Sequence, residues 1–441
     1  MVRNAHRDDP AQSASDLADL GALLLDAGLP VTDVRTALVS AGASETGDAP
    51  DVAVLPSHVL VGRADGPPAW ATSSAEALTT RQSARALLLL RGTDRRPSSS
   101  GDLAAAIRAI RETVPAHPLL GWTAGSALVA VGLAILFRCP WWAVATAAVG
   151  GALVGLLTRL MGRSDEASAI IPFVAAFAST LFVGSAAAVL AAGPVPLFAV
   201  CAPIAILVPG ALITNALLEL TAADIVTGSA RLTYGLVVLG FMCAGILAGG
   251  VMTGLSVDPA SAALIDQTAA LTSPSTGWNA LPALWTSWIG VPLLAVGVGL
   301  AFGAGVALTA VGVLVMSGAF ALLSALTPVC GALVATGATA AVLFVAARLI
   351  ERLGVGIPAA VTFQPAFLLL VPGSVGLVAL SATDPGSLAT ALFTFAALCI
   401  GTKVGAVVAD SRPRRLPTPT RRTTYEQPLR RRRRHHPHRR S

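Results

Sequence analysis

The acid with the most distinctive setting in this sequence is Glu219, which follows a long apolar run and lies four residues after Asn215. Residues four apart share a helix face, so the two side chains should form one polar stripe. Thr214 and Thr221 should form a second stripe, with Asp224 at its edge. Because an acid at membrane depth is costly, it usually faces a cavity, a partner or an ion path. We therefore expect Glu219 to carry protons.

The polar segment around Glu219 ends at Arg231, and we expect it to form a single helix over 211–228. The alternative is that this helix lies at the membrane interface, where water would solvate its charges. Other buried polar candidates are Gln364, Ser374 and Lys403. Lys403 could equally extend its ammonium group to the inner face of the membrane.

A Leu-Val-Pro-Gly phrase occurs twice, once with Pro209 and Gly210 and once with Pro372 and Gly373. Proline removes a backbone donor and glycine tolerates the freed geometry. In hydrocarbon, the exposed backbone groups need protein or a water-filled cavity. We therefore expect two broken helices that line a transport pathway. The alternative is a pair of ordinary proline kinks.

The composition requires a membrane. Of 441 residues, 54% are apolar and only 12% are charged, with a mean hydropathy of +0.72, whereas a soluble domain has about 25% charged residues. We predict ten transmembrane helices, since apolar runs of about 20 residues, enough to cross a bilayer, recur along the chain. The fourth run is too short to cross alone and is followed by the polar helix. The predicted spans are 119–137, 141–157, 168–191, 195–208, 232–255, 284–302, 306–326, 331–350, 358–380 and 388–408.

The two Leu-Val-Pro-Gly phrases fall in the fourth and ninth predicted spans, which is the fourth span of each five-span half. Since five is odd, the halves would be inverted relative to one another, as in transporters whose binding sites lie where interrupted helices meet. The fold class that we expect is therefore a mainly α polytopic membrane protein with two inverted five-helix repeats. Only a three-residue link separates the sixth and seventh spans, so their division is open.

The region before the first span has the composition of a small α/β domain. Apolar periodicity predicts helices over 15–28, 31–41 and 76–90, and an amphipathic helix over 102–113. Two short alternating runs, 51–55 and 59–61, predict a hairpin. No nucleotide-binding loop, catalytic triad or metal-ligand spacing is evident, so we expect no cofactor and no metal.

Charge placement predicts that both ends of the chain are cytoplasmic. Basic residues fall in the predicted inner loops at five positions and in the outer loops only at Arg138, as the positive-inside rule requires. The inner ones are Arg159, Arg163, Arg231, Arg348 and Arg352. Beyond Asp410 the chain has twelve arginines and one acid. We expect this tail to lie against anionic lipid rather than to bind nucleic acid.

The sequence thus predicts five segments in a multi-pass protein of the bacterial inner membrane, which could form a homo-oligomer. They are a cytoplasmic N-terminal domain (1–117), a first membrane module of five helices (118–255), an external loop (256–283), a second membrane module of five helices (284–410) and a disordered Arg-rich cytoplasmic tail (411–441).

Three stretches resemble the bacterial threonine/serine exporter family. Val208–Arg231 is similar to its signature stretch, with the Val-Pro-Gly step, Asn215, Glu219, Asp224 and Arg231 at matching positions. The segment from Leu23 to Arg35 resembles its cytoplasmic domain, and the second Leu-Val-Pro-Gly phrase resembles its companion membrane module. The resemblance implies a secondary exporter of threonine and serine that uses the proton motive force.

Two alternatives remain open. Related two-chain members of the family are associated with dicarboxylate export, and an anionic substrate would depend on Arg231 and Lys403. A protein of another class, a membrane-anchored enzyme or sensor acting through the N-terminal domain, would need only one or two spans.

Overall fold

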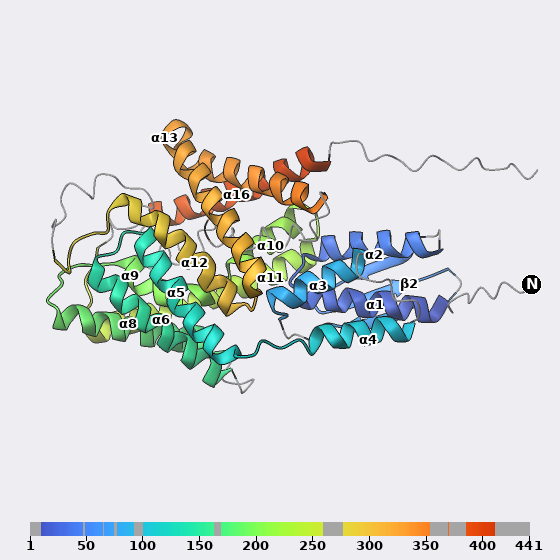
Figure 1. The fold of residues 1–441 in the computed structure, drawn as a ribbon, viewed down its shortest axis with the longest axis horizontal. Helices are drawn as coiled ribbons and strands as arrows, with labels where there is room; N and C mark the ends of the chain where they lie inside the picture. The colour runs from blue at the N-terminus through green and yellow to red at the C-terminus, as the bar shows by residue number, and fades with distance from the viewer. Residues whose placement is uncertain are drawn as a thin grey trace, which may run out of the picture.

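The computed structural model describes residues 10–46, 49–64, 66–74, 77–91, 100–162, 169–258, 277–352, 369 and 385–410. A domain formed by the first helices and strands lies at one end of the long axis, and a larger bundle of apolar helices lies at the other (Figure 1). Each part has its own cluster of buried apolar side chains.

The N-terminal domain is an antiparallel sheet covered by helices. The predicted hairpin is confirmed as β1 (Asp51–Val54) and β2 (His58–Gly62), and the sheet order is β1-β2-β3. Val59 and Val61 of β2 are wholly buried under α1 (Pro10–Asp26) and α2 (Val31–Thr46). The third strand, β3 (Ala69–Thr72), was not predicted, because its four residues include one exposed tryptophan and carry no clear alternation.

The other two helices of the domain are α3 (Thr80–Arg91) and α4 (Ser100–Arg111). The helix predicted over 76–90 starts later, because Thr79 and Gln82 form a reciprocal cap: the Thr79 amide donates to Gln82 Oε1 at 2.8 Å, and the Gln82 amide donates to Thr79 Oγ1 at 3.3 Å. The helix α4 leads to the membrane part and is held to the domain by Arg111.

The bundle contains six helices long and apolar enough to cross a membrane within the described part of the chain, or seven if one bent pair is a single span. The ten predicted spans are therefore borne out in part. The long helices are α5 (Pro118–Leu136), α6 (Trp141–Met161), α8 (Ile171–Val189), α11 (Ile225–Thr253), α12 (Ser287–Ala301, preceded by the 3₁₀ turn η4, Leu284–Thr286) and α13 (Gly305–Arg352).

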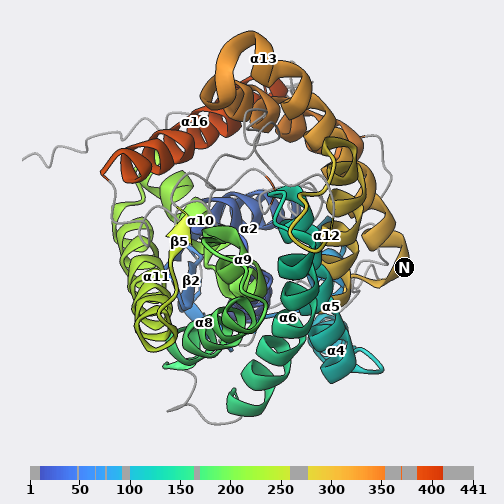
Figure 2. The same cartoon turned by 90° about the vertical axis from the view of Figure 1, so that its left-hand side faces the viewer.

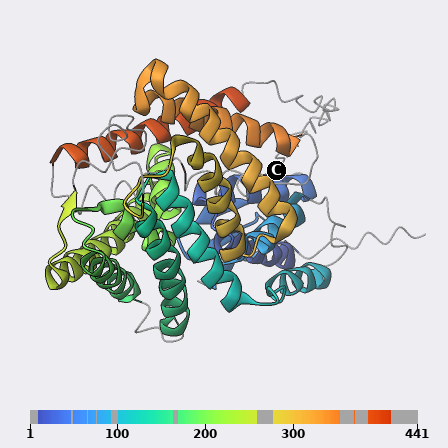
Figure 3. The ribbon, with the colours of Figure 1, turned by 60° about the vertical axis from the view of Figure 1, so that its left-hand side comes forward.

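The described part of the second half has breaks at two predicted places. The sixth and seventh spans are separate helices, α12 and α13, since Gly303 and Gly305 adopt positive φ between them. The seventh and eighth correspond to the two helices that make up α13, which meet at a kink at the non-helical Gly331. The helix α13 packs along α16 (Pro385–Asp410), and Figure 3 shows the two side by side. The ninth predicted span, 358–380, lies outside the described residues except Leu369.

A broken helix runs through the middle of the first half. It consists of β4 (Val195–Pro196), α9 (Leu197–Cys201), the 3₁₀ helix η1 (Ala202–Leu207) and α10 (Gly210–Thr221). Every residue of α9 is buried. In the view along the long axis, α9 lies inside the surrounding helices, and both it and η1 contact α5, α6 and α8 (Figure 2).

The closest contact between the two halves is a glycine seam between α5 and α12. A Cβ at Gly125 would come within 2.7 Å of Gly297 O, and one at Gly132 would come within 2.7 Å of Gly290 O. The pairing runs in opposite directions, so the helices are antiparallel. Small residues allow this close backbone approach, which supplies packing energy where lipid gives no hydrophobic driving force.

At the end of the bundle remote from the N-terminal domain, the connecting segments meet. The strand β4 pairs with β5 (Val257–Asp258) in parallel, and the Trp142 amide donates to Trp278 O at 3.1 Å. The N-terminal domain lies at the opposite end, where α5 begins and α12 finishes.

Candidate functional site

The chain bends sharply where the first Pro-Gly step was expected to break it. The segments Leu197–Leu207 and Gly210–Thr221 meet at an angle of 71°. Val208 is extended, with φ −63° and ψ 124°, and Pro209 precedes the first residue of α10. The Gly210 amide donates to Val208 O at 2.7 Å, so a tight local turn satisfies part of the backbone freed by the break.

The prediction of one polar helix over 211–228 is wrong. The helix α10 ends at Thr221, Ala223 adopts a left-handed conformation with φ 64°, and α11 starts at Ile225. Arg231 therefore lies inside α11 instead of closing the segment. This turn folds α11 back against α10, and Gly228 allows the approach, since a Cβ there would lie 2.9 Å from Ala216 O.

The consequence of this hairpin is a buried ion pair. Arg231 Nη1 lies 2.5 Å from Glu219 Oε1, and the Glu219 side chain is fully buried while that of Arg231 is 14% exposed. A buried carboxylate is stable only with charge or hydrogen-bond partners, and Arg231 supplies both. The second oxygen, Glu219 Oε2, is buried and has no hydrogen-bond partner among the described residues.

The other partner of Glu219 comes from the N-terminal domain. The backbone amide of Val31 donates to Glu219 Oε1 at 2.9 Å, across 188 positions of sequence. Val31 is the first residue of α2, and the first amides of a helix have no acceptor within it. Pro30 O accepts from the amides of Asp33 and Val34. The carboxylate thus caps a helix N-terminus, where the helix dipole also favours negative charge.

Asn215 holds the same turn. Its Nδ2 donates to Gly28 O at 3.2 Å, and Gly28 has φ 80°, a conformation that ends α1 and turns the chain toward α2. The face of α10 that carries Asn215 and Glu219 therefore does not open on solvent. It contacts the α1–α2 turn, the segment Gly28–Val31.

The remaining candidates are dispersed or undescribed. Thr214 is fully buried and donates to Gly210 O of its own helix at 2.9 Å. Asp224 precedes α11, makes no side-chain cap there and is half-buried. Lys403 is half-buried on α16. Four predicted site residues lie outside the described residues: Gln364, Pro372, Gly373 and Ser374.

The sequence analysis missed the partners that the N-terminal domain contributes. A backbone amide such as Val31 N–H has no residue-type signal, so no sequence pattern could have revealed it. A second contact was also missed: the Thr80 amide at the start of α3 donates to Phe302 O, in the turn between α12 and α13, at 2.8 Å.

No group of three or more His, Cys, Asp or Glu residues that could hold a metal ion occurs in the part of the chain that the structure describes. The arrangement can instead exchange one proton or one ion-pair partner at Glu219, and it can attach or release the α1–α2 turn of the N-terminal domain.

A family model described as "Putative threonine/serine exporter" matches residues 17–252, more than half of the chain. The match starts in α1 and ends in α11, so it includes both the α1–α2 turn and the Glu219–Arg231 pair. Neither a curated protein nor a solved structure matches the chain.

Proposed function

Because the chain belongs to the threonine/serine exporter family, we propose that it exports threonine and serine across the bacterial inner membrane as a secondary transporter driven by the proton motive force. The observation that carries the proposal is the fully buried Glu219, paired with Arg231 directly after a 71° break in a helix enclosed by the bundle. Ionisable groups and broken helices inside a membrane bundle are typical of ion-coupled transporters.

The glycine seam supports an inverted repeat. The α5 sequence from Gly125 to Gly132 and the α12 sequence from Gly290 to Gly297 share the pattern Gly-x-x-Leu-x-Ala-Val-Gly. Each is the first helix of its half, and the two pack antiparallel through these glycines. An axis in the membrane plane would relate two such helices, as it does in inverted-repeat transporters.

The length of α13 supports two passes on either side of Gly331. A helix of 46 residues would extend about 70 Å at 1.5 Å per residue, more than twice the about 30 Å hydrocarbon core. Gly331 has φ 77° and ψ 161°, and the neighbouring Val329 and Cys330 are exposed. Two passes there, with 358–380 as another, would restore five spans in the second half.

Glu219 is the residue that we assign to proton coupling. With Oε1 occupied by Arg231 and the Val31 amide, the unpartnered Oε2 is the position available for a proton. Neutralising the carboxyl would weaken its attraction for Arg231 and for the α2 N-terminus together, because both depend on its negative charge. Proton uptake would thus change how α10 is held.

The contacts of Arg231 favour an amino acid over a dicarboxylate as the substrate. A dianion needs positive groups free to pair with it, and Arg231 is already paired with Glu219 at 2.5 Å. An exporter-family chain with six or seven candidate spans also has more membrane structure than an anchored enzyme or sensor requires.

The test is efflux from proteoliposomes that contain the full chain and radiolabelled threonine, serine or succinate. We expect a proton gradient to accelerate threonine and serine efflux, and Glu219→Gln to remove this acceleration. Glu112→Gln, which makes the same change at an exposed acid outside the ion pair, is the matched control. Efflux of succinate alone would contradict the substrate, and an unchanged gradient response in Glu219→Gln would exclude Glu219 as the proton carrier.

A further inference from the structure

The N-terminal domain contacts the membrane part at two places that belong to different halves. Its α1–α2 turn contacts Asn215 and Glu219 of α10, in the half that begins with α5. The start of α3 contacts Phe302, between α12 and α13 in the other half. The domain therefore spans the junction between the halves at the end of the bundle remote from β4 and β5 (Figure 1).

The contact at the α12–α13 turn combines the Thr80–Phe302 hydrogen bond with apolar packing, and it lies close to a covalent tether. A Cβ at Gly303 would lie 3.2 Å from both Pro115 and Thr79, and Leu308 packs against the apolar cluster of the N-terminal domain. Pro115 belongs to the short link between α4 and α5. Separation would expose apolar surface to water, which is unfavourable, and the link would limit the distance. This contact should persist.

The contact at α10 is polar. The Val31 amide donates to Glu219 Oε1 at 2.9 Å, and Asn215 Nδ2 donates to Gly28 O at 3.2 Å. Glu219 Oε1 also binds Arg231. Water can replace each of these bonds when the surfaces part, so the net free energy holding them together is small compared with the strength of each bond in isolation. Glu219 Oε2 has no hydrogen-bond partner among the described residues while the surfaces are in contact. When they separate, it can accept a hydrogen bond from water.

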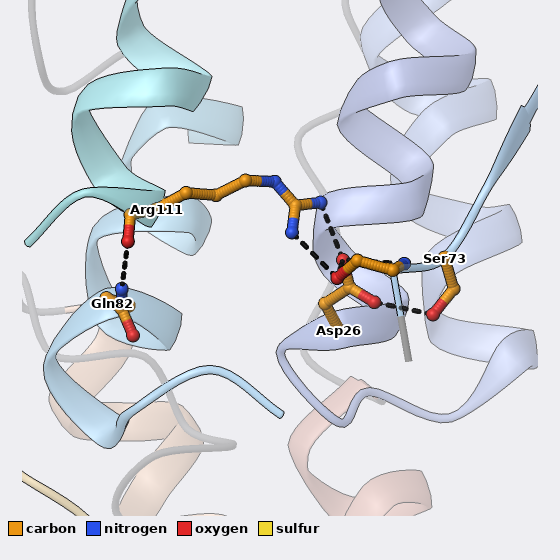
Figure 4. A network of polar contacts seen from close by, with 5 residues as sticks. Asp26, Ser73, Gln82 and Arg111 are labelled. Atoms are coloured by element: carbon orange, nitrogen blue, oxygen red, sulfur yellow. Dashed lines mark hydrogen bonds and ion pairs between the residues drawn. The ribbon is translucent and has the colours of Figure 1, made fainter. Parts of the chain in front are cut away.

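Within the N-terminal domain, a hydrogen-bond network connects the elements that make the two contacts, and such networks rigidify the elements that they join. Asp26 lies at the C-terminal end of α1, next to the α1–α2 turn, and it binds Arg111 of α4 at 2.6 Å and Ser73 Oγ at 2.5 Å. Leu78, just before α3, donates its amide to Asp26 O at 3.0 Å. The two contact surfaces are thus joined through one network (Figure 4).

We propose that the N-terminal domain is a brace across the two halves of the transporter, whose α1–α2 end detaches from α10 in each cycle while its α3 end stays attached. This inference rests on the proposed export function. Alternating access moves one half against the other, which changes the separation between α10 and the α12–α13 turn. A rigid domain cannot hold both surfaces throughout such a movement, and the polar contact is the one that yields.

The test is to lock each end in turn. Thr32→Cys with Ala222→Cys places thiols beside the Val31–Glu219 contact, and Arg81→Cys with Ala307→Cys places them beside the Thr80–Phe302 contact. The background is Cys330→Ala, because Cys330 is exposed and the other four cysteines are buried. A bis-maleimide long enough to bridge neighbouring helices is applied, and threonine efflux from proteoliposomes is measured before and after.

We expect the 32–222 cross-link to slow efflux by at least about tenfold, because it blocks a movement that each cycle needs. The 81–307 cross-link should change the efflux rate by less than about twofold, because that contact stays attached. If the 32–222 protein exports equally fast after cross-linking, the brace does not detach and the proposal is wrong. Inhibition by both cross-links would contradict the assignment of the fixed end.

Two further outcomes are informative. If the thiols at 32 and 222 each react with a monofunctional maleimide but do not cross-link, the contact itself is contradicted, and the brace with it. If the uncross-linked protein moves no threonine, the proposed export function fails, which is a separate result from any effect of cross-linking.

Discussion

Among the described residues, two buried carboxylates pair with an arginine each, and they differ in how many of their oxygens have hydrogen-bond partners. Asp26, inside the N-terminal domain, accepts hydrogen bonds from Ser73 Oγ, Ser74 Oγ, the Ser74 amide and Arg111. Glu219, between that domain and the bundle, uses one oxygen for two donors and leaves the other without a partner among the described residues.

The difference separates a structural carboxylate from an exchangeable one. A fully satisfied buried network rigidifies the elements that it joins, and Asp26 joins α1, α4 and the segment after β3 (Figure 4). When only one oxygen of a buried acid has hydrogen-bond partners, the interactions with those partners do not fully compensate the free energy of desolvation. Asp26 should therefore control stability, whereas Glu219 should control the docking of the domain and transport.

The largest effect on stability is expected for Asp26→Ala. Removing the carboxylate leaves the Ser73 and Ser74 donors and the Arg111 guanidinium without their acceptor, which should cost about 3–5 kcal/mol. Hydrogen exchange of the full chain in detergent should show faster exchange throughout α1, β3 and α4. Asp51→Ala, an exposed aspartate on β1, is the control and should leave exchange unchanged; equal exchange in the two variants would contradict a structural role.

Glu219→Gln should have a smaller and more local effect. The amide oxygen can still accept from Val31, but the charge-assisted bond to Arg231 is lost, at a cost of about 2 kcal/mol. Exchange should rise at the first amides of α2 and remain unchanged in β1 and β2. Faster exchange of the whole sheet would mean that Glu219, like Asp26, is structural.

Arginine-to-lysine substitutions should distinguish the two sites by geometry. Arg111 uses Nη1 for Ser74 and Nη2 for Asp26, a fork that lysine lacks, whereas Arg231 binds Glu219 through Nη1 alone. We expect Arg111→Lys to lower the free energy of unfolding by about 1–2 kcal/mol and Arg231→Lys by less than about 1 kcal/mol. Thermal unfolding in detergent measures both; the reverse order would contradict the comparison.

A small and local effect is expected for Asn215→Ala, which removes one partly exposed hydrogen bond worth about 1 kcal/mol. The detached state of the domain should become about fivefold more populated. A Thr32→Cys probe in the Cys330→Ala background should then react about fivefold faster with maleimide. Thr221→Ala, which removes a hydroxyl that binds only its own helix, should leave the rate unchanged.

Local chemistry made several elements predictable. The alternating runs predicted β1 and β2, and apolar length predicted α5, α6 and α8 to within a few residues. The helix α11 begins at Ile225, earlier than the predicted span 232–255. The first Pro-Gly step coincides with the 71° bend. The prediction of a continuous helix over 211–228 was wrong because Ala223 takes a left-handed conformation, which alanine adopts rarely and which its side chain does not signal. The described residues contain six or seven candidate spans instead of ten, because the fourth predicted span is a bent pair of short helices and the seventh and eighth meet at the kink in α13.

The sequence by itself determined that the chain is a multi-pass membrane protein with a small N-terminal region of helices and strands, and it identified Asn215, Glu219 and Arg231 as residues of interest. Only the tertiary structure decided what they contact. Two of the three stretches that carry the family resemblance meet across 188 positions through a backbone amide, a group that every residue except proline has. Side-chain pattern can indicate that a buried acid needs a partner, but only the packing of two domains determines which amide becomes that partner.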